Sequence, residues 1–138
     1  MNSFAEIARA LSEGVGDLQV QDWHHIPLSS GAELRLLPSG PGGELLAVLA
    51  RQGAHRSAKA AEATRLNLLR IGADTRWTDA FSGGVDENGW ECIAVRLRMP
   101  QDAQAIEETL HRMQARIQAA TGESPTGQVR PVCTWGLP

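Results

Sequence analysis

A β-hairpin is predicted by the stretch Asp79–Pro100, which reads DAFSGGVDENGWECIAVRLRMP. Two strand-like runs meet at an acidic turn that ends in Asn88-Gly89. Asn-Gly is a strong hairpin signal because a tight turn needs residues that tolerate positive φ. In the second run the apolar side chains alternate with the others, so one face is expected to pack on a core. That core face holds Ile93, Val95, Leu97 and Met99.

The pairing of the two runs decides what the other face of the hairpin carries. A two-residue loop at Asn88-Gly89 places Ile93 opposite Gly84 and Val95 opposite Ser82. A four-residue loop shifts the pairing by two residues and leaves the faces unchanged. The second face is then more apolar than an ordinary solvent face, and we expect it to carry function. Its apolar residues are Phe81, Val85, Trp90 and Cys92.

The elements around the hairpin predict an α+β domain in the order α-β-β-β-α-β-β-α, a twisted antiparallel sheet with helices packed on it. Ser3 and Glu6 form a capping box at the start of a first helix, and Ser57 can cap a second one that runs to Ile71. A third helix begins near Asp102 and carries the cleanest amphipathic stripe of the chain. Three strands are expected between the first two helices, over 18–26, 33–37 and 44–51.

Composition is that of an ordinary globular protein, and it excludes several classes. Of the 138 residues, 42% are hydrophobic and 21% charged, and the formal net charge of −3 argues against nucleic acid as a partner. No apolar run is long enough for membrane insertion, and the N-terminus does not resemble a signal peptide. We therefore expect a cytoplasmic location. Residues 1–121 are expected to form the domain, and residues 122–138, rich in Gly and Pro, a C-terminal tail.

No catalytic or metal-binding constellation is found, and no cofactor is predicted. His24 and His25 are adjacent on a strand, so they point to opposite faces and cannot readily share a metal ion. Cys92 lies among apolar neighbours, where a cysteine is more often a small hydrophobe than a nucleophile. Four arginines form a candidate anion site, although a solvated or ion-paired surface is the expected role for Arg65, Arg70, Arg96 and Arg98.

The pattern resembles the class I chaperones of bacterial type III secretion. The second predicted helix ends in LNLLRIG (66–72), an Asn-bearing, leucine-rich segment. A hairpin with an acidic turn follows, and its second strand closes with the apolar-Arg-apolar-Pro ending Leu97-Arg98-Met99-Pro100. The resemblance covers roughly residues 3–120 by element order, and 66–110 by local sequence.

The resemblance implies a homodimer without enzymatic activity, which holds the N-terminal segment of a secreted effector extended and presents it to the secretion apparatus. The secretion ATPase is a further candidate partner. Carried onto this chain, the dimer contacts would be Leu66, Leu69, Phe81, Trp90 and Cys92. The cargo contacts would be Phe4, Ile7 and Leu11 on the first helix, with Leu34 and Leu36 on the second strand.

Two other interpretations stay open. The chain could be a small-molecule-binding α+β domain with a cavity between sheet and helices. It could also be a regulatory subunit of the same fold that binds a protein that is not secreted. An enzyme is the weakest hypothesis, because paired carboxylates or a nucleophile with a base are absent from the pattern.

Overall fold

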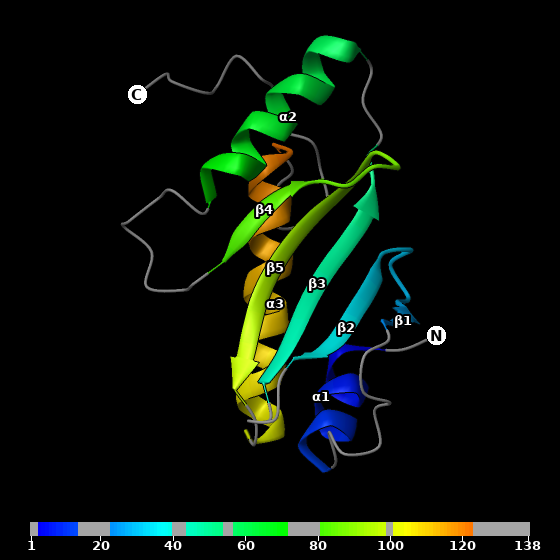
Figure 1. Cartoon of the computed structure of the whole chain (residues 1–138), viewed down its shortest axis with the longest axis vertical. Helices are drawn as coiled ribbons and strands as arrows, with labels where there is room; N and C mark the ends of the chain where they lie inside the picture. The colour runs from blue at the N-terminus through cyan, green and yellow to red at the C-terminus, as the bar shows by residue number, and fades with distance from the viewer. Residues whose placement is uncertain are drawn as a thin grey trace.

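The computed structural model describes residues 3–13, 23–39, 44–53, 57–71, 81–98 and 101–122. It confirms the predicted α+β order, with three helices and five strands (Figure 1). The elements are α1 (Phe4–Glu13), β1 (His24–Pro27), β2 (Glu33–Ser39), β3 (Glu44–Gln52), α2 (Ala58–Ile71), β4 (Ser82–Val85), β5 (Trp90–Arg98) and α3 (Ala103–Ala120). The start of the strand expected over 18–26, the residues Met99 and Pro100, and the tail beyond Gly122 lie outside the described residues.

The strands form one antiparallel sheet in the order β1-β2-β3-β5-β4. The first three strands pair in sequence order as an antiparallel meander. The chain then passes through α2 and returns to the far edge of the sheet as β4, and β5 fills the position between β4 and β3. The two edge strands are therefore β1 and β4.

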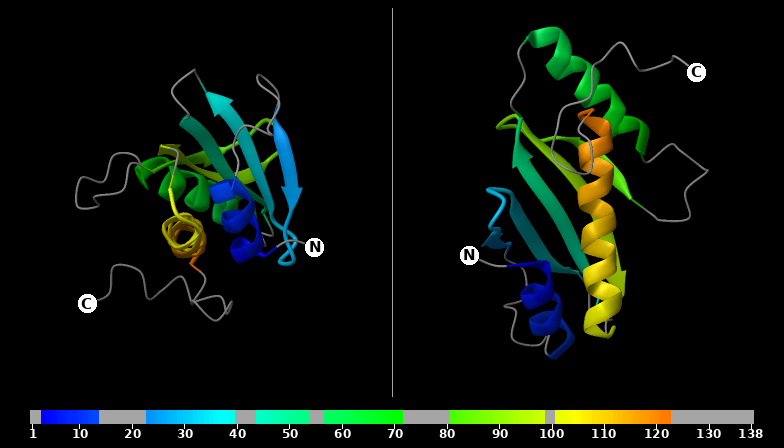
Figure 2. Two further views of the ribbon diagram at one scale, coloured as in Figure 1. Left: turned by 90° about the horizontal axis from the view of Figure 1, so that it is seen from below. Right: turned by 180° about the vertical axis from the view of Figure 1, so that it is seen from behind.

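The helices lie on one side of the sheet, as the views from below and from behind show (Figure 2). α3 runs along the sheet, α1 packs against α3, and α2 packs on β4. The core between these layers takes alternate residues from the three long strands and one stripe from each helix. We call this covered side of the sheet the inner face and the opposite side the outer face.

Local capping explains where the helices begin. Ser3 Oγ accepts a hydrogen bond from the amide of Glu6 at 3.2 Å, and Ser57 Oγ accepts one from Ala60 at 3.1 Å. Asp102 Oδ1 accepts one from Ala105 at 2.8 Å at the start of α3. Each bond satisfies an amide that has no partner within its own helix, so the first turn is stabilised by residues adjacent in the sequence.

The hairpin turn differs from both predicted pairings. Asp86 and Trp90 form the closing pair, because the Asp86 amide donates to the Trp90 carbonyl at 2.9 Å. Gly89 has a φ of 82°, and its amide donates to the Asp86 carbonyl at 3.0 Å. The loop thus contains three residues, the arrangement in which a type I turn is followed by a left-handed residue. Asp86 also stabilises this turn through its side chain, since Oδ1 accepts from the amides of Asn88 and Trp90, both at 2.9 Å.

An odd loop length exchanges the two faces of β4. Ser82 pairs with Ala94 and Gly84 with Cys92, so these small residues lie on the outer face. The prediction that Phe81 and Val85 share a face with Trp90 and Cys92 is wrong. Val85 pairs with Glu91, so it stands on the side of Glu91 and Ile93. Phe81 is 4% exposed within the core, and the guanidinium of Arg116 on α3 lies 5.1 Å from the centre of its ring.

α2 and α3 meet at the end of α3 through one side chain of the leucine-rich segment. Asn67 donates from Nδ2 to the carbonyl of Ala120 at 3.1 Å. The last carbonyls of a helix lack partners in their own helix, so this bond supplies one of them. Nearby, Arg51 on β3 reaches the buried carboxylate of Glu91 at 3.3 Å and donates to Thr121 Oγ1 at 2.6 Å. The asparagine of the motif therefore has a structural role.

Candidate protein-interaction site

Among the described residues, no group of three or more His, Cys, Asp or Glu side chains could hold a metal ion. The two adjacent histidines illustrate why. His24 pairs with Leu36, which is buried on the inner face, while His25 pairs with Arg35 on the outer face. None of the helices described here has the length and apolarity to cross a bilayer.

No described helix covers the outer face of the sheet (Figure 2). Its side chains stand in rows that cross the strands, and the register identifies them. Next to the hairpin turn, Gln52 pairs with Trp90. The following row is Glu33, Ala50, Cys92 and Gly84, and the one after it is Arg35, Val48, Ala94 and Ser82. A further row is Leu37, Leu46 and Arg96. This face mixes apolar, small and charged side chains, as is usual for a surface that contacts a partner.

An ion pair crosses the outer face. Arg35 on β2 donates from Nη1 to Asp86 Oδ2 at 2.9 Å, although β3 and β5 lie between their strands. Its guanidinium carbon also lies 5.4 Å from the centre of the Trp90 ring, a cation–π distance. The side chain therefore crosses the sheet from β2 toward the hairpin turn, on the same face as the fully buried Ala50 of β3.

Electrostatics favour the charged forms of this pair. Burial alone would raise the pKa of Asp86, but the amide of Trp90, the guanidinium of Arg35 and the amide of Asn88 all donate to its carboxylate. The net effect is a pKa below the ordinary value of 3.8. Burial would likewise lower the pKa of Arg35, but the bond to Asp86 and the nearby carboxylate of Glu33 outweigh it, so the pKa is raised. Glu33 Oε2 lies 3.6 Å from Arg35 Nε, and its other oxygen contacts His25.

Three apolar side chains are exposed beside the edge strand β4. Leu66 and Leu69 on α2 are 41% and 48% exposed, and Val85 on β4 is 38% exposed. Leu69 reaches the strand, since its Cδ2 lies 3.8 Å from the position that a Cβ on Gly84 would occupy. We call Leu66, Leu69 and Val85 the edge patch. Exposed leucines next to an edge strand are typical of a surface that another protein covers.

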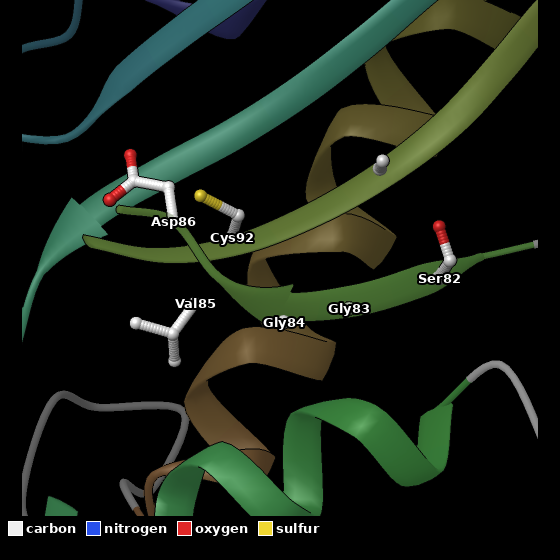
Figure 3. A pocket seen from close by; sticks show the side chains of 7 residues that line it. Ser82, Gly83, Gly84, Val85, Asp86 and Cys92 are labelled. Atoms are coloured by element: carbon white, nitrogen blue, oxygen red, sulfur yellow. The ribbon is translucent and has the colours of Figure 1, made fainter. Parts of the chain in front are cut away.

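A shallow depression of about 210 Å³ lies next to the edge patch (Figure 3). It exists because β4 and β5 present small side chains there. Its lining residues are Ser82, Gly83, Gly84, Val85, Asp86, Cys92 and Ala94. Burial comes first among the causes that raise the pKa of the Cys92 thiol, and the nearby carboxylate of Asp86 adds to it. The cysteine therefore stays protonated near neutral pH and behaves as an apolar lining residue.

The predicted dimer contacts are only partly brought together. Leu66 and Leu69 are exposed on α2, and Trp90 and Cys92 are half-buried on the outer face. The fifth, Phe81, lies in the core. The edge patch gains Val85 instead, which the sequence had placed among the apolar residues of the hairpin.

Four of the five predicted cargo contacts lie in the core and not on the surface. Ile7 and Leu11 are 5% exposed, and Leu34 and Leu36 are fully buried. The alternation on β2 was read correctly, but the face with the leucines is the one that the helices cover. Only Phe4 keeps exposed surface, and its ring contacts His111 on α3 edge to face, with 5.0 Å between ring centres.

The sequence reasoning did not find the Arg35–Asp86 pair. The two residues are 51 positions apart, and each belongs to an ordinary local pattern. Only the neighbours in the assembled sheet bring them together. The acidic turn is recognisable in the sequence, but the ion pair between this turn and β2 is not.

Comparison with known proteins identifies the fold. No family model matches the chain, and no curated protein matches it in sequence. A chain in the crystal structure of the ExsC–ExsE complex superposes with a TM-score of 0.53. The two chains share this fold. The superposition covers 88% of this chain and 95% of the other at 15% sequence identity. The predicted α+β architecture is thereby confirmed at the level of the fold.

Proposed function

We propose that this protein is a non-enzymatic cytoplasmic chaperone that binds the N-terminal segment of a type III secreted effector and keeps it extended. It would present that segment to the secretion apparatus, with the secretion ATPase as a further partner. The observation that carries the proposal is the fold shared with a chain of the ExsC–ExsE complex over 88% of the residues. The uncovered sheet face supports the same conclusion, because apolar side chains exposed together on a surface usually mark a site where a partner binds.

The chaperone is proposed to act as a homodimer through the edge patch and the depression beside it. The patch presents protruding leucines on α2, and the depression next to it is lined by small residues. A two-fold axis through β4 would place the edge patch of one copy near the depression of the other. A symmetric dimer needs this kind of self-complementary surface. The subunit contacts would then include Leu66, Leu69, Val85 and Cys92.

The effector is proposed to contact the outer face away from the edge patch, together with Phe4 at the start of α1. The buried residues Ile7, Leu11, Leu34 and Leu36 would support these contacts from below without touching the cargo. Trp90, stacked against Arg35, lies between the two proposed surfaces.

Oligomeric state and cargo capture test the proposal together. Native mass spectrometry should give a dimer, and coexpression with the N-terminal segment of a secreted effector from the same genome should give a stable complex. A strict monomer that retains no effector segment would overturn the proposal. Capture of a protein that is not secreted would instead support a regulatory subunit of the same fold.

One substitution tests the dimer surface. Leu69→Asp places a charge in the edge patch and should give monomer or aggregate on size-exclusion chromatography, because an unpaired charge within an apolar interface is costly. Ala10→Asp is the matched control, since it adds the same charge to an exposed position on α1. An unchanged dimer in Leu69→Asp would exclude α2 from the subunit contact.

A further inference from the structure

The far end of the outer face, away from the hairpin turn, combines apolar and basic side chains. Leu37 and Leu46 are direct neighbours on β2 and β3, and Val48 stands one row further along β3. All three are half-buried, and no described helix lies over them (Figure 2). An apolar group of this kind on a sheet usually packs against a second layer.

Two arginines border this apolar group on β5. Arg96 stands in the same row as Leu46, and Arg98 stands opposite Glu44 in the next row. Arg96 is exposed and makes no ion pair with any residue of the described ranges. The side chain of Arg98 is 89% exposed, with its Nε 3.8 Å from Glu44 Oε1. This end of the face therefore carries a net positive charge on a chain whose formal net charge is −3.

The positive charge is local, because near the hairpin turn the outer face carries two carboxylates, Glu33 and Asp86, beside one arginine, Arg35. Near the hairpin turn, Arg35 is paired with Asp86 and Glu33, and Glu33 is also in contact with His25. The basic side chains at the far end lack such a set of partners. Charges of one sign beside an apolar surface favour a partner with the opposite sign at the same spacing.

We infer that the far end of the outer face, made of Leu37, Leu46, Val48, Arg96 and Arg98, binds an extended peptide segment in which apolar residues are followed by acidic ones. The inference rests on the proposed function, because the occupant is taken to be a segment of the bound effector. The apolar side chains of the segment cover Leu37, Leu46 and Val48, and its carboxylates lie at the two arginines. A basic segment of equal apolarity is rejected by like charge.

Labelled peptides test this charge preference directly on the full chain. The probes are three fluorescent peptides of about 12 residues. They share four Leu or Val positions and differ only in whether the remaining positions hold Asp, Ser or Lys. Fluorescence anisotropy should show the Asp peptide binding about tenfold more tightly than the Lys peptide. The difference should shrink between about 50 mM and about 300 mM NaCl, because salt screens exposed charges.

Charge reversal locates the site. The double variant Arg96→Glu, Arg98→Glu should invert the order of the Asp and Lys peptides, and Leu46→Gln should weaken all three. The matched control is Arg9→Glu, Arg70→Glu, which changes net charge equally at exposed positions off the outer face. Equal binding of the three peptides, binding of none of them, or the same inversion in the control would overturn the inference. A chain that still captures an effector segment in any of those cases would keep the proposed function.

Discussion

Gly83 on β4 and Leu68 on α2 lie in direct backbone contact. A Cβ built on Gly83 would lie 2.5 Å from the carbonyl oxygen of Leu68 and 3.2 Å from its carbonyl carbon. No side chain fits there, because the obstacle is backbone of a packed helix. The glycine thus allows α2 to approach β4, and it explains why an edge strand as short as Ser82–Val85 can anchor a helix of 14 residues.

Gly83→Ala should therefore destabilise the domain by about 1–3 kcal/mol, the range for overpacked sites. Urea denaturation measures the loss. Gly84→Ala is the control on the same strand, because the nearest atom to its Cβ would be Leu69 Cδ2 at 3.8 Å, an ordinary contact. That control should stay within about 0.5 kcal/mol of the parent protein. Equal losses in the two variants would contradict the close approach of α2.

The second prediction concerns the carboxylate of Asp86. Its pKa is lowered in the folded state, so the group contributes stability above its ordinary pKa and loses it as the pH falls through the folded value. Asp86→Asn should cost about 1–2 kcal/mol near pH 7, because the amide keeps the turn bonds but loses the charge-assisted bond to Arg35. The difference between the two proteins should begin to shrink as the pH falls below about 4, and it should vanish only below the lowered pKa of Asp86.

Chemical denaturation at several pH values measures this convergence. Glu87→Gln is the control, because Glu87 is an exposed neighbour in the same turn. A difference between Asp86→Asn and the parent that is constant from neutral to acidic pH would show that the charge of Asp86 is not the stabilising feature.

The third prediction concerns the bond between α2 and the end of α3. Asn67→Ala leaves the Ala120 carbonyl without its donor and should lower stability by about 1 kcal/mol. Hydrogen exchange should also increase in the last turn of α3, more than elsewhere in that helix. Lys59→Ala, at an exposed position of α2, should change neither quantity. Unaltered exchange in Asn67→Ala would mean that the bond does not hold the helix end.

The fourth prediction separates the two apolar residues at the start of α1. Ile7 is 5% exposed in the core, so Ile7→Asp should destabilise the fold by about 3 kcal/mol or more. Phe4→Asp should keep the fold, because Phe4 is only partly buried at the edge of the core. Circular dichroism distinguishes the variants. If the Ile7→Asp protein were folded, Ile7 would have to be exposed, and it would again be a candidate contact for the cargo.

Sequence patterns succeeded where the physical cause is local. The residues that cap the helices act on amides three positions away, as Ser3, Ser57 and Asp102 do. The alternation along β5 follows from strand geometry alone, and its odd-numbered residues from Glu91 to Leu97 are all buried. The element order that follows from these signals was sufficient to identify the fold.

The sequence predicted less well which apolar residues are buried and which are exposed. The alternation of the sequence predicts that Leu34 and Leu36 share a face of β2. Whether helices or a partner protein cover that face depends on how α1 and α3 pack. The same applies to Ile7 and Leu11, whose stripe would look the same on an exposed amphipathic helix.

The sequence by itself thus determined the hairpin, its acidic turn and the order of the elements around it, because propensity, capping and alternation operate over a few residues. Only the tertiary structure decided that the turn has three loop residues, which moves Phe81 into the core and leaves Gly84 opposite Cys92. The ion pair between Arg35 and Asp86 and the exposure of Leu66 and Leu69 beside β4 are likewise features of the tertiary structure alone. These features depend on which strands become neighbours and on which side the helices pack, and contacts between distant segments set both.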